Sequence, residues 1–292
     1  MNDSIPGLRF GEFQGLPALI VHTPHSRAAV SLFGGHVLSW APHGFDDVLW
    51  LSPTTRRPPD PIRGGIPVCW PYFARQGQPA QAPMHGLVRT MQWRLNHAER
   101  SAEGDITLAL MPPEVPDVPM SVMLTMRIGA TLEQALTTVN LSRDRVRFTQ
   151  ALHTYFHVGD ARTISVDGVD GLTYADKFDD FNEHRQGGDW QLFGDRDGGR
   201  SDRIYRDTEG RFGLRDPAAQ RRITLSTTGS RALVVWNPGA DAIKTFPDLP
   251  ADAWQRFVCL EAANCGDDVI ELGPDDSHVL QQTIACNALI QH

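Results

Sequence analysis

The chain has 292 residues, of which 41% are hydrophobic, and its formal net charge is −8. Its apolar runs are far shorter than the roughly 20 residues that cross a bilayer as a helix, so we expect no membrane span. The acidic balance, without a basic block, argues against binding to nucleic acid or to an anionic membrane surface. No signal peptide is visible at the N-terminus, and the four cysteines form no CxxC pair. We therefore expect a cytoplasmic protein.

Short strand-like runs separated by Pro, Gly, Asn and Asp recur along the whole chain, which is typical of a sandwich or barrel. A short helical turn is expected at 250–255, and a Gly-, Asp- and Arg-rich surface loop at 189–211. Nothing resembles a domain boundary, so we predict one all-β domain over residues 1–292. The expected strands are 17–22, 28–33, 48–51, 92–97, 106–111, 120–130, 135–141, 148–158, 222–226, 232–236, 257–262, 268–272 and 278–285.

Two Pro- and Gly-rich segments carry candidate anion-binding side chains. The segment 61–73 predicts a rigid loop, in which the planar guanidinium of Arg63 could hold an anion. The segment 83–89 places His85 and Arg89 four residues apart around a glycine. Taken alone, each segment is more typical of an ordinary structural turn.

The segment 151–158 predicts a strand on which His153, Tyr155 and His157 share one face. His153 is a candidate general acid, because histidine titrates near neutrality. Two histidines four residues apart also raise the possibility of a metal site. The segment looks extended and offers no carboxylate to complete a ligand set, so we expect no metal.

The segment 257–264 is an apolar strand that carries one carboxylate, Glu261. Burying an unpaired charge is costly, so Glu261 must lie at an edge, be paired or be functional. Partial burial would raise the pKa of its carboxyl group, which suits a general base. Asp202, in the segment 201–205, could bond sugar hydroxyls or belong to an ordinary loop.

Seven segments in the same order resemble the aldose 1-epimerase (mutarotase) superfamily, and its glucose-6-phosphate 1-epimerase branch in particular. Each is weak alone, but together they cover nearly the whole chain. The matching segments are 34–40, 63–73, 85–89 with Trp93, 152–156, 202–205, 235–239 and 258–261.

The resemblance implies a large antiparallel β-supersandwich with few short helices, and a reaction that needs no cofactor. It implies that His153 protonates the ring oxygen of a sugar and that Glu261 removes the proton of the anomeric hydroxyl. His85 would polarise the ring oxygen or a nearby hydroxyl, and Asp202 would bond hydroxyls. Arg63 and Arg89 would hold a phosphate.

The leading hypothesis is therefore a mutarotase that acts on a hexose 6-phosphate such as glucose 6-phosphate, and we expect it to be a monomer. Tyr155 is then expected in the pocket wall and His157 at its rim. Two alternatives stay open from the sequence. One is a mutarotase for a free hexose or another phosphosugar. The other is a non-catalytic carbohydrate-binding module, against which the His153 and Glu261 pair argues. A structural or regulatory protein is the least favoured reading.

Overall fold

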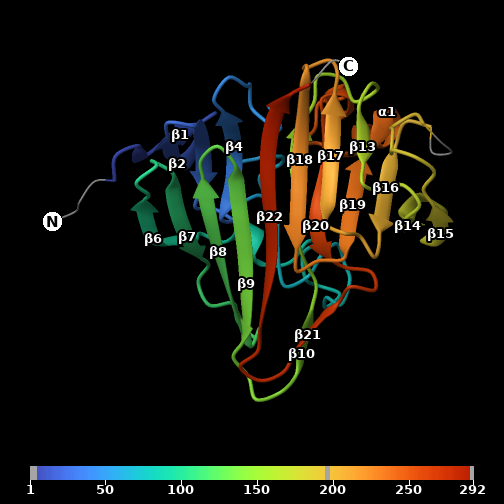
Figure 1. The fold of residues 1–292 in the computed structure, drawn as a ribbon. Helices are drawn as coiled ribbons and strands as arrows, with labels where there is room; N and C mark the ends of the chain where they lie inside the picture. Colours follow the sequence, from blue (N-terminus) through green and yellow to red (C-terminus); the bar gives the residue numbers. More distant parts are fainter. Residues whose placement is uncertain (1–4, 195–197, 290–292) are drawn as a thin grey trace.

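The computed structural model describes residues 5–194 and 198–289, and it is built almost entirely from antiparallel strands. This confirms the all-β fold (Figure 1). The first four strands form a sheet of their own, in chain order, near the N-terminus. These strands are β1 (Leu8–Phe13), β2 (Leu16–His22), β3 (Ser26–Ser31) and β4 (His36–Pro42).

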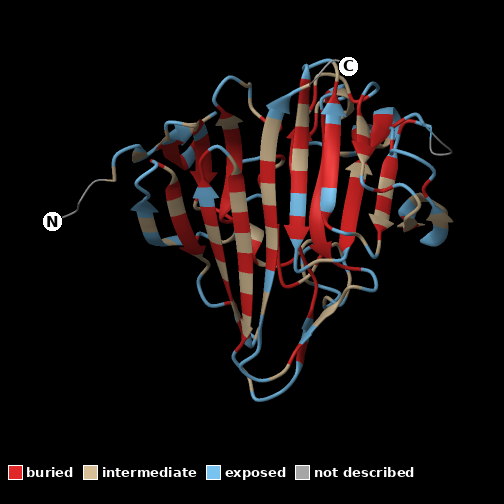
Figure 2. Ribbon diagram, in the orientation of Figure 1, coloured by how far each residue is buried: buried red, intermediate tan, exposed pale blue. Residues whose placement is uncertain are grey.

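One eight-stranded sheet, the back sheet, contains the long strands that dominate Figure 1. Its strands alternate between buried and partly exposed residues (Figure 2), because one face covers the core and the other faces solvent. In spatial order they are β13 (Ser165–Asp167), β17 (Arg211–Asp216), β18 (Arg221–Thr228), β22 (Ser277–Ala288), β9 (Leu132–Asn140), β8 (Met120–Ile128), β7 (Ile106–Met111) and β6 (Arg94–Arg100).

A second eight-stranded sheet, the site sheet, carries the residues singled out above. In spatial order its strands are β15 (Asn182–Arg185), β14 (Thr173–Asp176), β16 (Ser201–Tyr205), β19 (Ala232–Asn237), β20 (Phe257–Asn264), β11 (Gln150–Leu152) and β5 (Val68–Cys69), with β12 (Tyr155–His157) also paired to β20. The smaller elements are the pair β10 (Val146–Phe148) and β21 (Ile270–Leu272), helix α1 (Gly239–Ala242) and the 3-10 turns η1 (Val88–Thr90), η2 (Lys177–Asp179), η3 (Ile243–Thr245) and η4 (Ala253–Gln255). Among the described residues, no helix is both long and apolar enough to span a membrane.

The main core lies between the two eight-stranded sheets. Side chains alternate along β20, so the face of this strand that points away from the core can carry a site. Val258, Leu260 and Ala262 belong to the same buried cluster as Leu124 and Leu136 of the back sheet. Phe257, Cys259 and Glu261 must then point to the opposite face. All eight residues of β20 are buried, so this second face is covered as well.

Three expected elements differ from the structure. No strand forms at 48–51, where only Leu49 and Leu51 make isolated bridges, to Phe156 and Gly64. The strand expected at 148–158 is divided into β10, β11 and β12. The amide of Thr149 donates to the carbonyl of Pro71 at the first break, and the amide of Thr154 donates to the carbonyl of Leu152 at the second. The loop expected at 189–211 contains β16, and residues 195–197 lie outside the described part. The charged residues of β16 resemble those of a polar loop in sequence. In the structure Arg203 is buried, and its guanidinium donates to Gln186.

Candidate active site

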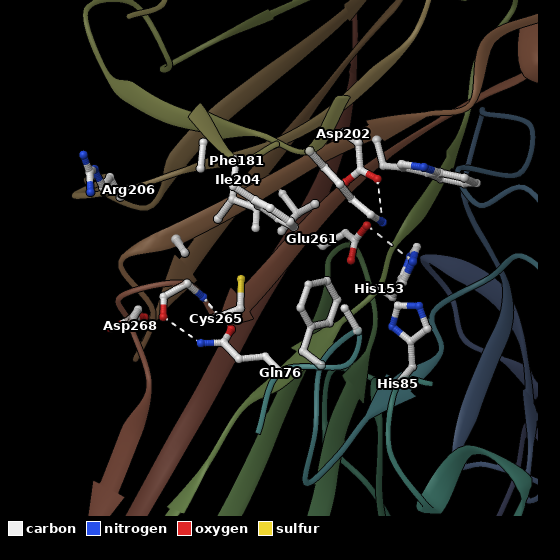
Figure 3. Close-up of a pocket in the computed structure, with 18 of the residues that line it drawn as sticks. Gln76, His85, His153, Phe181, Asp202, Ile204, Arg206, Glu261, Cys265 and Asp268 are labelled. Carbon is white, nitrogen blue, oxygen red and sulfur yellow. Dashed lines mark hydrogen bonds and ion pairs between the residues drawn. The ribbon is translucent and has the colours of Figure 1, made fainter. Parts of the chain in front are cut away.

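A cavity of about 1010 Å³ opens on the face of the site sheet that points away from the main core. The strand register aligns Glu261, Val234, Ile204 and Ala175 in one row across β20, β19, β16 and β14. Glu261 is the only acid of this row, and the three apolar side chains extend the floor beyond it. The loops that carry Gln76 and His85 form another part of the wall (Figure 3), and Arg89 of η1 also lines the cavity.

His153 and Glu261 face each other across two paired strands. The pairs Leu152↔Ala262 and Tyr155↔Cys259 share one register, which places His153 opposite Glu261. The Nε2 atom of His153 lies 3.4 Å from Oε1 of Glu261, and both side chains are buried. The remaining polar atoms, His153 Nδ1 and Glu261 Oε2, have no hydrogen-bond partner in the structure. Such buried, unpartnered atoms are typical of a functional site.

Burial shifts the pKa of both groups toward their neutral forms. Burial, then the charge of Asp202, raises the pKa of Glu261 well above 4.5. Burial, followed by His85 and the arginines, lowers the pKa of His153 well below 6.5. Both directions favour a neutral carboxyl group beside a neutral imidazole over the charged pair.

His85 lies beside His153 on the side away from Glu261 (Figure 3), and the two rings are 5.4 Å apart. Burial and the nearby arginines lower the pKa of His85 to about 3, so its imidazole is neutral. Its Nδ1 lies 3.6 Å from the thiol sulfur of Cys69. The following Gly86 has φ +83°, and a Cβ there would meet the carbonyl oxygen of Trp70. Glycine at 86 therefore allows this loop to pair closely with the backbone at Trp70.

Two arginines lie on the His85 side of the cavity. Arg63 is fixed by Asp248, whose Oδ2 lies 2.9 Å from its Nε, and its Nη1 donates to the hydroxyl of Tyr155 at 3.1 Å. The ring of Tyr155 stacks on that of His153 with centroids 4.9 Å apart. Arg89 forms no ion pair with any described residue. Burial and the charge of Arg63 lower its pKa, as expected for a cation without a counter-ion.

Asp202 lies on the other side of Glu261 and is paired with Lys177, whose Nζ is 2.9 Å from Oδ2 (Figure 3). Burial raises the pKa of Asp202, and Lys177 opposes that shift. The pair leaves one carboxylate oxygen and the lysine side chain beside the cavity. These groups can bond hydroxyls without adding net charge.

The six residues singled out from the sequence all line this one cavity: Arg63, His85, Arg89, His153, Asp202 and Glu261. Tyr155 lines it as well, as expected of a wall residue. The expectation for His157 was wrong, because His157 does not line the cavity. Trp50 and Phe257 pack against Tyr155 with ring centroids 6.1 and 5.3 Å away, and this cluster closes the wall before His157.

Three further residues shape the cavity but were not found from the sequence: Lys177, Trp236 and Asp248. Lys177 could have been noticed, because the chain has only one other lysine, Lys244. Asp248 had no signal, since its role depends on meeting Arg63 from a distant part of the chain.

His153, Cys259 and Glu261 each offer one potential metal-binding atom, and these atoms lie within 4.8 Å of one another. Two of them already form the His153–Glu261 contact. Burial raises the pKa of the Cys259 thiol well above 9.0, and a protonated thiol is a poor ligand. The contact between His153 and Glu261 is of the kind that acid–base chemistry uses.

Comparison with known proteins identifies the family of this chain. Residues 18–285 match the aldose 1-epimerase family model. A protein of Escherichia coli K12, provisionally named a glucose-6-phosphate 1-epimerase, is 35% identical over 267 residues, covering 88% of this chain and 86% of the relative. A Salmonella typhimurium relative with the same provisional name is 32% identical over 262 residues, with coverages of 88% and 86%.

Similarity extends to solved structures. The crystal structure of a protein from Salmonella typhimurium, provisionally named a mutarotase, superimposes with a TM-score of 0.87 at 28% identity, covering 99% of this chain and 96% of that one. A Synechocystis protein superimposes with a TM-score of 0.73 at 18% identity, with coverages of 99% and 98%, which concerns the fold alone. The chain therefore belongs to the aldose 1-epimerase family and is an enzyme that interconverts the anomers of a sugar.

Proposed function

We propose that the enzyme interconverts the α and β anomers of a hexose 6-phosphate, with glucose 6-phosphate as the first candidate. The observation that carries this proposal is the buried contact between His153 and Glu261 in a cavity that also contains Arg63 and Arg89. The provisional names of the relatives support the same substrate class.

In the reactive form of the pair, Glu261 is a carboxylate and His153 an imidazolium. Glu261 removes the proton from the anomeric hydroxyl while His153 delivers a proton to the ring oxygen. The bond between the anomeric carbon and the ring oxygen breaks, and an open-chain aldehyde forms. After rotation of the aldehyde end, the reverse transfers close the ring on its other face. Each positioned acid or base typically contributes about 10²–10⁴-fold to the rate.

The order of groups around the cavity suits a sugar with a phosphate at one end. The charges of Arg63 and Arg89 act on His85 and His153, whereas those of Asp202 and Lys177 act on Glu261. A phosphate held by both guanidinium groups would leave the ring oxygen near His153 and the anomeric hydroxyl near Glu261. Guanidinium groups suit this role because their planar donors match phosphate oxygens.

The remaining polar groups would orient the sugar. His85, with a neutral ring, can donate one hydrogen bond toward the ring oxygen or an adjacent hydroxyl. Asp202 and Lys177 would together accept from and donate to sugar hydroxyls on the far side of Glu261. Trp236, at the edge of the aromatic cluster, offers an apolar surface for a pyranose face.

The test is anomer exchange measured by magnetization-transfer NMR with glucose 6-phosphate and with glucose. The proposal predicts enzyme-dependent exchange of glucose 6-phosphate with the larger kcat/KM of the two. Equal or greater efficiency on free glucose would remove the phosphate argument and favour a free-hexose mutarotase. Binding without exchange of any sugar phosphate would favour a carbohydrate-binding module.

A further inference from the structure

The reaction needs Glu261 ionised and His153 protonated, yet both side chains are buried, and burial favours their neutral forms in the free protein. Something that arrives with the substrate must reverse this distribution. We propose that the substrate's phosphate, bound between Arg63 and Arg89, transfers the proton from Glu261 to His153 and so converts the pair to its reactive form. This inference rests on the proposed function and adds a switch to it.

The contact between the two residues provides the path for this transfer. The Nε2 atom of His153 lies 3.4 Å from Oε1 of Glu261, which needs only a small approach for proton transfer. His153 Nδ1 and Glu261 Oε2 have no other partner, so no fixed hydrogen bond holds either residue in one protonation state. The proton stays within the pair, and no proton enters or leaves the protein.

Burial is the main reason why the free protein disfavours an imidazolium at His153, and the charges around the ring add to this effect. Two of the cations are neutralised, because Lys177 is paired with Asp202 and Arg63 with Asp248. Arg89 is paired with no described residue, and one positive charge therefore remains. The titratable and charged groups that face His153 are Arg63, Cys69, His85, Arg89, Tyr155, Lys177, Asp202, Asp248, Cys259 and Glu261.

A bound phosphate reverses the sign of the net charge near His153. The phosphate of a sugar is largely a dianion at pH 7, because its second pKa is about 6. Added to one remaining positive charge, it leaves a net negative charge beside His153, which favours the imidazolium. Burial strengthens such interactions relative to water.

The structure also links the phosphate site mechanically to the acid. Arg63 donates to the hydroxyl of Tyr155, and the Tyr155 ring stacks on His153 with an interplanar angle of 8°. Movement of Arg63 toward a phosphate would therefore shift the Tyr155 ring, and with it the imidazole of His153. The phosphate then contributes to kcat and not only to KM, which distinguishes this switch from simple anchoring.

The first experiment supplies the two parts of the substrate as separate molecules, free glucose and inorganic phosphate. Exchange of free glucose is measured with increasing inorganic phosphate at constant ionic strength, and the enzyme-free rate at each phosphate concentration is subtracted. We expect a saturable increase of at least about tenfold in enzyme-dependent kcat/KM, as restoring a general acid should give. We expect Arg89→Met to lose this increase. No increase at any phosphate concentration in the wild-type enzyme would overturn the switch.

The second experiment observes His153 directly. Protein labelled with ¹⁵N-histidine is titrated to saturation with 1,5-anhydroglucitol 6-phosphate, which has the ring and the phosphate but no anomeric hydroxyl. The His153 signal is assigned by its loss in His153→Asn. We expect a neutral imidazole in the free protein and with 1,5-anhydroglucitol, and an imidazolium in the phosphate complex. The same protonation state in all three samples would overturn the switch.

These outcomes can be told apart from failure of the proposed function. Exchange of glucose 6-phosphate without phosphate activation of glucose would reject the switch and keep the mutarotase. Absence of exchange with glucose 6-phosphate itself would reject both.

Discussion

His153 lies opposite Glu261 on neighbouring strands, with Nε2 of one 3.4 Å from Oε1 of the other. The separation is set by backbone pairing on both sides of the contact, at Leu152↔Ala262 and Tyr155↔Cys259. An acid and a base held by strand register need little reorganisation during the reaction. Burial also makes the charged form of each residue costly for the folded protein.

This cost gives a prediction for the pH dependence of stability. The pKa of Glu261 is raised in the folded protein above 4.5, so the folded state binds the proton more tightly than the unfolded state. The contribution of Glu261 to the free energy of unfolding is therefore full below pH 4.5 and is lost as pH rises toward the folded-state pKa. Glu261→Gln removes this loss.

We expect Glu261→Gln to have a higher melting temperature than the wild type at pH 8, and the gap to disappear near pH 4. Thermal unfolding followed by circular dichroism across this range measures it. Glu183→Gln is the control, because Glu183 lines the same cavity but is exposed. A gap of constant size at all pH values would show that Glu261 has no raised pKa.

The unpaired cation Arg89 gives a prediction for selectivity. Arg89→Met should lower kcat/KM for glucose 6-phosphate by about 10–100-fold, which corresponds to the loss of a charged hydrogen bond worth about 1.5–3 kcal/mol. The preference for glucose 6-phosphate over glucose should shrink by a similar factor. Arg206→Met is the control, since Arg206 lies elsewhere in the cavity and is paired with Glu183 and Asp267. Equal losses in both variants would contradict a phosphate site at Arg89.

The loop that carries His85 gives a prediction about backbone geometry. Gly86→Ala would bring a Cβ against the carbonyl of Trp70 at a positive φ, so it should displace His85 and reduce kcat. Gly77→Ala has a similar φ of +73° but open space around its Cβ. The free energy of unfolding of Gly77→Ala should fall only by the roughly 1–2 kcal/mol that a left-handed conformation costs a residue with a Cβ, as measured by urea unfolding. A smaller loss of stability and activity for Gly86→Ala than for Gly77→Ala would contradict the proposed role of the loop.

The sequence was sufficient for those features that depend on local pattern. An isolated carboxylate in the apolar run 257–264 singled out Glu261, and alternation placed His153 and Tyr155 on one face. Both follow from strand geometry and from the cost of burying a charge. The resemblance then brought together residues whose spatial proximity no local pattern contains.

Features that depend on tertiary contacts could not be predicted. Alternation placed His157 beside Tyr155, but Trp50 packs between the cavity and that end of the strand. The strand β16 looked like a loop because buried Arg203 packs over Tyr174 with its charge held by Gln186. β4 was missed because its buried residues show no alternation.

The most direct test of the central claim is the anomer-exchange rate of glucose 6-phosphate in Glu261→Gln, measured by NMR beside the wild type and Glu183→Gln. Binding of 1,5-anhydroglucitol 6-phosphate is measured by calorimetry on the same samples. The account predicts that kcat falls by about 10²–10⁴-fold in Glu261→Gln, while this variant still binds 1,5-anhydroglucitol 6-phosphate. Glu183→Gln should show no such loss of kcat. Exchange at the wild-type rate in Glu261→Gln would contradict it.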